Sequence, residues 1–210
     1  ISAAMVTSML GACGSSNTSS SSASSTATSS VSASSASEED TTAASSSVSA
    51  SSASEEVSAD ADQEAADKVA ALIDAIYVQE RNDNTDEQCK EAKEAWDALT
   101  DAQKELVEGE NADPDYFGRD TGDASKDDPL NGDEIGENEL LVVSFGTSFN
   151  DSRAEDIGGV EKALQAAYPD WSVRRAFTAQ IIINHVQARD DEKIDNVDQA
   201  LERAVSNGVK

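Results

Sequence analysis

The sequence predicts an α/β domain with a parallel sheet over residues 139–210, preceded by a disordered serine-rich tether and a small all-α hairpin. Three observations support this. Residues 139–145 form a short apolar run typical of a buried strand, and helical and strand patterns alternate after it. Residues 62–109 carry apolar side chains at helical spacing. Serine occupies 22 of the 44 positions from 15 to 58, a composition that favours disorder.

The charge balance excludes two classes of partner. The chain has 42 acidic and 15 basic residues, a net charge of −27. It therefore lacks the basic surface that a nucleic-acid backbone requires. An anionic lipid surface would also repel it, so any membrane link must be covalent or hydrophobic. Residues 140–210 hold 11 acids and 8 bases, so this nearly neutral stretch is predicted to be a separate folding unit.

Residues 1–13 look like the remnant of a signal peptide. Leu10-Gly-Ala-Cys13 resembles the lipobox of bacterial lipoproteins, in which the cysteine sulfur receives a diacylglyceryl group after cleavage. This resemblance implies that Cys13 is lipidated and that the protein is anchored on the extracytoplasmic face of the cell membrane. A chance cysteine after an apolar run is the alternative.

Residues 14–61 are predicted to be a disordered tether rich in Ser and Ala. The nonapeptide at residues 31–39 recurs at 48–56, but a repeat this polar has nothing to bury. A flexible coil of about 50 residues spans roughly 40 Å. The tether could therefore carry a domain clear of a lipid surface.

Residues 62–109 are predicted to be an acidic helical hairpin followed by one short helix. Capping boxes at Thr85–Gln88 and Thr100–Gln103 begin the second and third helices. Cys89 lies on an apolar stripe, so a buried free thiol is expected. The hairpin is either a docking module or a solvated spacer. The first helix carries apolar residues at i, i+3, i+4 and i+7, namely Val69, Leu72, Ile73 and Ile76.

Residues 110–138 hold turn signals and few apolar residues, and are predicted to be a second linker. After the first strand, a capping box at Ser152–Glu155 is expected to open a helix. Residues 171–178 alternate as a second strand. Thr178 and Asp195 are then expected to cap two further helices.

The candidate site lies where the first strand meets its helix, because ligands of open α/β sheets bind at the carboxyl ends of the strands. Hydroxyl groups gather there, and Gly146 permits a close backbone approach. Arg174 and Arg175 lie on opposite faces of the second strand, so at most one points into the cleft. These groups favour a ligand rich in carboxylates or phosphates, although a purely structural turn is the alternative. The candidate substrate-binding residues are Ser144, Gly146, Thr147, Ser148, Arg175 and Thr178.

The run Leu141-Val-Val-Ser-Phe-Gly-Thr-Ser148, followed by Arg174-Arg-Ala-Phe-Thr178 and Ile181-Ile182, resembles the anaerobic sirohydrochlorin cobaltochelatase family. The likeness covers residues 139–210. It implies a class II chelatase fold, with two α/β lobes around a tetrapyrrole cleft. It also implies an enzyme, a lyase, that inserts cobalt(II) as substrate metal into sirohydrochlorin during anaerobic cobalamin biosynthesis. Sirohydrochlorin is a polycarboxylate, which suits the predicted cleft.

In that family the catalytic and metal-ligating His and Glu residues come later in the domain. The resemblance therefore implies that residues 139–210 are a truncated N-terminal part, with no catalytic residue, metal ligand or bound cofactor of their own. We expect His185 to be structural, with axial ligation of a metallo-tetrapyrrole as the alternative. Two other functions stay open: a surface tetrapyrrole- or metal-binding protein without catalysis, and a purely structural surface protein. The sequence is also compatible with a homo-oligomer.

Overall fold

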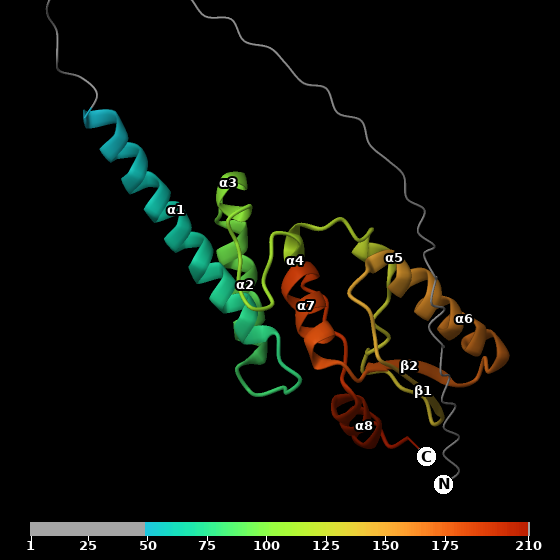
Figure 1. The fold of residues 1–210 in the computed structure, drawn as a ribbon. Helices are drawn as coiled ribbons and strands as arrows, with labels where there is room; N and C mark the ends of the chain where they lie inside the picture. Colours follow the sequence, from blue (N-terminus) through green and yellow to red (C-terminus); the bar gives the residue numbers. More distant parts are fainter. Residues whose placement is uncertain (1–48, 210) are drawn as a thin grey trace, which may run out of the picture.

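The computed structural model describes residues 49–209, with side chains from residue 58 onward. Cys13 and most of the predicted tether lie outside these residues. In the described part, a helical region is followed by an α/β region that contains one small sheet (Figure 1). None of the helices in this part combines the length and apolar character needed to cross a bilayer.

The helical region is built around a long helix and a shorter one that packs beside it (Figure 1). Their shared core is aliphatic and aromatic, with Ile73, Ala92 and Val107 fully buried. This core confirms the predicted amphipathic stripe of the first helix. The helices of this region are α1 (Ser49–Ile76), α2 (Thr85–Asp97), α3 (Asp101–Lys104) and α4 (Asp115–Gly118).

Helix α1 begins at Ser49, inside the segment that the sequence predicted to be a disordered tether up to residue 61. Alanine and glutamate have high helix propensity. Once the packed part of α1 has formed its first turns, each further residue adds one backbone hydrogen bond at low cost. The prediction considered only burial and missed this extension.

One of the two predicted capping boxes of the helical region is confirmed. The Thr100 hydroxyl accepts a hydrogen bond from the Gln103 amide at 3.3 Å, and the Gln103 side chain accepts one from the Thr100 amide at 2.8 Å. The box at Thr85 was wrong. Thr85 is the first residue of α2 and is buried, and its hydroxyl accepts from the Asn82 amide at 2.9 Å, so it closes the preceding loop instead.

The predicted linker at 110–138 is partly built into the core. Helix α4 buries Tyr116 and Phe117, and the Phe117 ring centroid lies 5.6 Å from that of Trp96 in an edge-on contact. A 3₁₀ turn, Ala124–Lys126, precedes Asp127, whose side chain is 1% exposed. Because turn residues are frequent in this segment, the sequence analysis did not predict that two aromatic rings and one carboxylate would be buried there.

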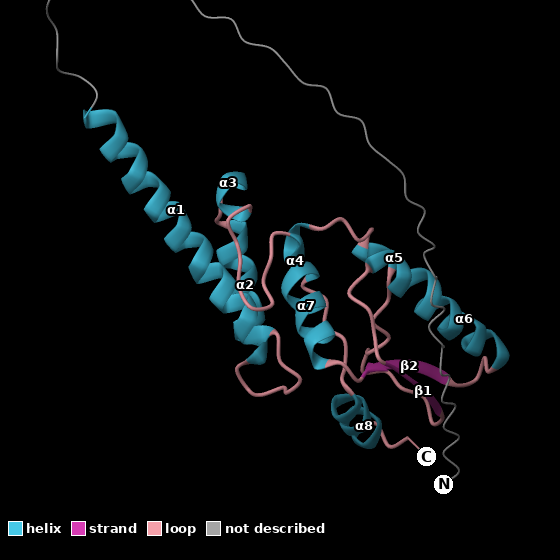
Figure 2. Ribbon diagram, in the orientation of Figure 1, coloured by secondary structure: helices cyan, strands magenta, loops and turns pink. Residues whose placement is uncertain are grey.

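The α/β region contains a two-stranded parallel sheet, as the sequence predicted (Figure 2). Strand β1 (Glu139–Ser144) pairs with β2 (Ser172–Phe177) in register from Glu139↔Ser172 to Ser144↔Phe177. The crossover comprises α5 (Asn150–Ser152), a π-helical turn (Arg153–Ile157) and α6 (Gly158–Ala167), which packs on β2. Helix α8 (Val197–Ser206) contacts both strands.

The helices of the α/β region begin differently from the sequence prediction. The crossover helix starts at Asn150, and no capping box forms at Ser152. Thr178 does not cap α7 (Gln180–Asp190), whose first amide instead donates to the Gln79 side chain at 3.0 Å. Asn196, not Asp195, caps α8, because Asp195 is engaged by Arg203 at 2.9 Å.

Helix α7 joins the two regions. It packs against α2 and, less extensively, α1. The Asn184 side chain donates to the Ile76 carbonyl at 2.9 Å, and Cys89 donates to the Asn184 carbonyl at 3.5 Å. The free, buried Cys89 thiol is confirmed, and burial raises its pKa to about 11.

Candidate functional site

The loop after β1 turns sharply over the end of β2. Gly146 has a φ of +96°, and a Cβ atom built there would lie 2.4 Å from the Phe177 ring. Only glycine fits, both because of its backbone conformation and because of this close approach. The approach predicted for Gly146 is therefore made to the protein's own core.

Four of the predicted hydroxyl residues meet at this loop. The Ser144 hydroxyl is buried and has no hydrogen-bond partner among the described residues. Thr147 accepts from the Phe149 amide at 3.1 Å, which shapes the turn. Exposed Thr178 donates its amide to the Ser144 carbonyl at 2.9 Å. Ser148 is half-buried and follows Thr147. These four residues therefore lie at the carboxyl end of β1 or beside it.

Two exposed aromatic rings flank the Gly-Thr-Ser turn. Phe145 is 64% exposed and Phe149 is 44% exposed. Sequence reasoning treated Phe145 as the last strand residue and overlooked Phe149, although the symmetric Phe-Gly-Thr-Ser-Phe spacing was visible. Exposed flat rings on a loop offer a stacking surface for a planar apolar ligand.

Arg175, which the sequence predicted to bind substrate, lies away from the loop and is paired with acidic residues of the protein itself. Arg175 is 1% exposed, and its guanidinium donates to Glu161 at 2.7 and 2.8 Å and to Asp127 at 2.6 and 2.9 Å. Burial opposes its charge, but these hydrogen bonds more than offset burial and raise the pKa of Arg175 above its ordinary value. Strand alternation points Arg175 toward Glu161 of α6, and Glu161 and Asp127 together accept four hydrogen bonds from its guanidinium.

Arg174 also lies away from the loop. Its side chain is buried near Glu139, at the opposite end of β1, and beside Gly132. Burial lowers the pKa of Arg174 and raises that of Glu139. Neither arginine of β2 thus supplies the cation predicted for the hydroxyl cluster.

Two other arginines stand beside the loop, in a recess of about 180 Å³. Arg189 donates to the Ser148 carbonyl at 2.7 Å and to the Asn150 side chain at 3.0 Å. The Arg119 guanidinium lies 5.5 Å from the centroid of the Phe149 ring. Sequence reasoning overlooked Arg119 because it falls in the predicted linker. The recess is lined by Asp113, Asp115, Tyr116, Arg119, Thr121, Ser148, Phe149, His185 and Arg189.

His185 is structural, as expected. Its Nε2 donates to the Tyr116 carbonyl at 2.5 Å, and its ring stacks on that of Tyr116 with centroids 4.0 Å apart. Burial lowers the pKa of His185 to about 4, so the ring is neutral at pH 7. Within residues 58–209, no group of three or more His, Cys, Asp or Glu side chains is placed to hold a metal ion.

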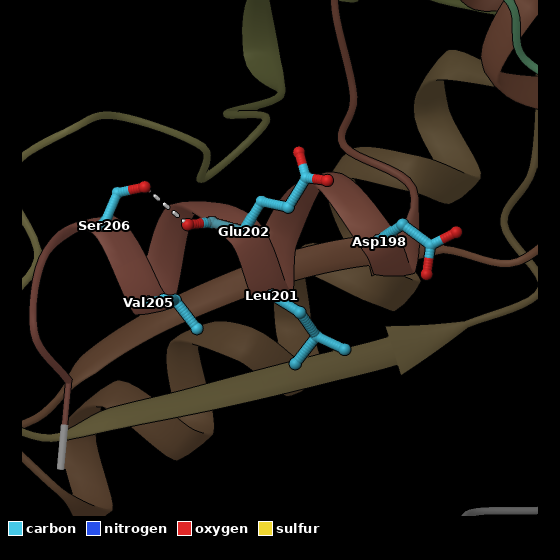
Figure 3. A pocket seen from close by; sticks show the side chains of 5 residues that line it. All are labelled: Asp198, Leu201, Glu202, Val205 and Ser206. Carbon is cyan, nitrogen blue, oxygen red and sulfur yellow. Dashed lines mark hydrogen bonds between the residues drawn. The ribbon is translucent and has the colours of Figure 1, made fainter.

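A hollow on α8 offers less chemistry than the loop. Figure 3 shows Leu201 and Val205 projecting from one side of the helix, whereas Glu202 and Ser206 project from the other. Asp198 completes the residues that line the hollow. The Ser206 hydroxyl is bonded to the Glu202 carbonyl at 2.8 Å. This hollow therefore lacks the convergent polar groups that are typical of a ligand site.

Comparisons with known proteins find relatives of the C-terminal part of the chain, which contains this loop. Residues 138–210 match the family model described as Cobalt chelatase (CbiK). The sirohydrochlorin cobaltochelatase of Salmonella typhimurium is 44% identical over 71 residues, which are 34% of this chain and 27% of that protein. The chain thus spans about 27% of the length of this curated relative. No solved structure matches the chain. The resemblance is confirmed for the C-terminal third, which contains the loop.

Proposed function

We propose that residues 139–210 are the substrate-binding part of a sirohydrochlorin cobaltochelatase, which inserts cobalt(II) into sirohydrochlorin in anaerobic cobalamin biosynthesis. One observation carries the proposal. The segment similar to the cobaltochelatase of Salmonella typhimurium contains an exposed Phe-Gly-Thr-Ser-Phe loop. That loop follows a parallel strand and adjoins the buried Ser144 hydroxyl, which has no hydrogen-bond partner in the described part of the chain.

The loop suits a flat macrocycle that carries carboxylates. Phe145 and Phe149 offer their rings to the macrocycle, and the hydroxyls of Thr147 and Thr178 can donate to peripheral carboxylates. These residues bind and orient the substrate. Orientation alone contributes to rate, because it removes the entropy of bringing the reactants together.

The groups that take pyrrole protons and deliver cobalt are proposed to lie outside residues 139–210. Metal insertion needs a base for those protons, and His185 is unsuited because its Nε2 is bonded to the Tyr116 carbonyl. The similarity to 27% of the relative supports the idea that the activity belongs to a longer protein. Cobalt(II) is a substrate in this proposal, and no resident cofactor is invoked.

The test is a titration of the complete gene product with sirohydrochlorin, followed by absorption spectroscopy after addition of cobalt(II). Tight binding and the spectral change of metal insertion are expected. Phe145→Ala should weaken binding by about tenfold, since base-like stacking on one ring contributes about 1–3 kcal/mol. Val205→Ala, which removes an exposed apolar side chain on α8, is the matched control. Absence of binding would contradict the proposal.

Binding without insertion would favour the second candidate, a surface protein that captures tetrapyrroles or metals without catalysis. The observation in its favour is that His185, the chain's one histidine, is committed to a structural contact. The spectroscopic assay separates the two functions directly.

We further propose that Cys13 carries a lipid and holds the protein on the extracytoplasmic face of the membrane. The Leu10-Gly-Ala-Cys13 pattern and the serine-rich stretch after it support this. Cys13→Ser should move the protein from the membrane fraction to the soluble fraction. Cys89→Ala, a change at the other cysteine, should leave it in the membrane fraction. Membrane retention of the Cys13→Ser protein would refute the lipid anchor.

A further inference from the structure

The segment Arg119–Gly122, which precedes the matched region, is fixed against the candidate loop. The Asp151 amide donates to the Thr121 carbonyl at 2.9 Å, and the Asn150 side chain donates to the Gly122 carbonyl at 3.3 Å. Gly122 has a φ of +101°, and a Cβ built there would lie 2.1 Å from the Asp151 carboxylate. Glycine therefore lets this segment approach the start of α5 more closely than any other residue would.

A second anchor holds the other side of Arg119. Helix α4 ends at Gly118, and its Tyr116 carbonyl accepts the hydrogen bond from His185 on α7. The Phe117 ring packs edge-on against Trp96 and Tyr116. Arg119 therefore lies between two fixed points of the backbone. Because its backbone is already ordered, little further conformational entropy would be lost when a ligand binds.

The Arg119 guanidinium has unused hydrogen-bond donors. It is exposed and lies over the Phe149 ring, and within residues 58–209 its side chain makes no hydrogen bond or ion pair. Asp113 and Asp115 line the same recess without engaging it. Arg189, in contrast, is already bound to a carbonyl and to Asp190. Arg119 is thus the cation at this recess that is available to a ligand.

We propose that Arg119 is a substrate-binding residue that pairs with a peripheral carboxylate of the tetrapyrrole lying on the Phe145–Phe149 loop. A guanidinium presents a planar fork that matches a carboxylate. This inference rests on the proposed function and deepens it, because Arg119 lies outside the segment similar to cobaltochelatases.

The test compares sirohydrochlorin binding by the complete protein and by its Arg119→Gln variant. Loss of a hydrogen bond to a charged group is expected to raise Kd by about tenfold or more. Arg119→Lys should recover part of the affinity, because it restores charge without the fork. Lys126→Gln removes an exposed positive charge from the same part of the chain, outside the recess, and should leave Kd unchanged.

A methyl-esterified sirohydrochlorin distinguishes recognition of the carboxylate from support of the loop. With the ester, the Kd values of the protein and of Arg119→Gln should be equal, because the ester has no anionic group to pair with. An equal loss on both ligands would overturn the inference. If the protein binds sirohydrochlorin and Arg119→Gln binds it equally well, this inference fails and the proposed function stands. If the unaltered protein does not bind, both fail.

Discussion

The two regions of the molecule are held together by different forces. The helical region has an extended apolar core, in which Ile73, Ala92 and Val107 are fully buried. The α/β region has an apolar cluster of four buried residues: Phe177, Ile183, Val186 and Ile194. Its largest fully buried side chains are instead Arg153 and Arg175. An apolar core tolerates the exchange of one hydrophobic side chain for another of similar volume. A buried charge, in contrast, is strongly destabilising unless an oppositely charged partner stays in place.

Asp127 is the partner that the α/β region requires. Its carboxylate accepts from Arg153 at 2.6 Å and from Arg175 at 2.6 and 2.9 Å. Burial alone would raise the pKa of Asp127, but hydrogen bonds from these two arginines hold that pKa below its usual value. A residue of the predicted linker thus neutralises the two arginines that are buried beside the sheet.

The largest effect on stability is expected from Asp127→Asn, which tests whether buried ion pairs hold the α/β region together. It leaves two buried guanidinium groups short of negative charge, and a loss of about 3–5 kcal/mol in the free energy of unfolding is expected. Urea denaturation followed by circular dichroism measures it. Asp156→Asn, an exposed change on the crossover helix, should be nearly neutral. A similar small loss for both variants would show that the buried pairs do not hold this region.

The corresponding change in the helical region is Ile73→Ala. Ile73 is fully buried, and the cavity should cost about 2–4 kcal/mol in the same urea experiment. Because α7 packs on α2, both regions should unfold in one transition. Leu106→Ala, at a site that is 39% exposed, is the control. Two separate transitions would contradict the shared interface.

The His185 contact between the regions predicts a dependence of stability on pH. The pKa of His185 is about 4 in the folded protein against 6.5 ordinarily, so between these values only the unfolded chain binds the proton. Its contribution to stability is complete above pH 6.5 and is lost as pH falls toward 4, at about 1.4 kcal/mol per pH unit. Thermal melts from pH 7 to 4.5 should show a smaller decline for His185→Gln. Equal declines would contradict the burial of this ring.

The smallest expected effect is at the exposed rim of the interface. Lys193 pairs with Asp86 at 3.0 Å, with side chains 60% and 42% exposed. Lys193→Gln should change stability by no more than about 0.5 kcal/mol, because solvent screens such pairs. A calorimetric loss comparable to that of Ile73→Ala would mean that charge, and not packing, joins the regions.

The same contrast explains how much could be predicted from sequence. Periodicity located the stripe that contains Ile73, and the polar turn after β1 marked the hydroxyl cluster with Ser144. Both are local patterns. The pairing of Arg175 with Asp127 joins residues 48 positions apart, and strand alternation says only that Arg175 faces away from Arg174. The sequence pattern does not reveal which face of β2 lies against a buried acidic residue, because that depends on how distant segments pack.

The role of Arg119 was hidden for the same reason. It depends on the contact of the Thr121 carbonyl with α5 and on the neighbouring Phe149 ring, and neither leaves a local pattern in the sequence. The strand and turn patterns of the sequence pointed to the matched segment alone. The cation that completes the site comes from the region before it.

A structure of the complete protein with sirohydrochlorin bound would test the central claim most directly. The account predicts that the macrocycle lies against Phe145 and Phe149 and that one peripheral carboxylate is within hydrogen-bond distance of Arg119. A macrocycle seated elsewhere, with both rings and Arg119 still open to solvent, would contradict it.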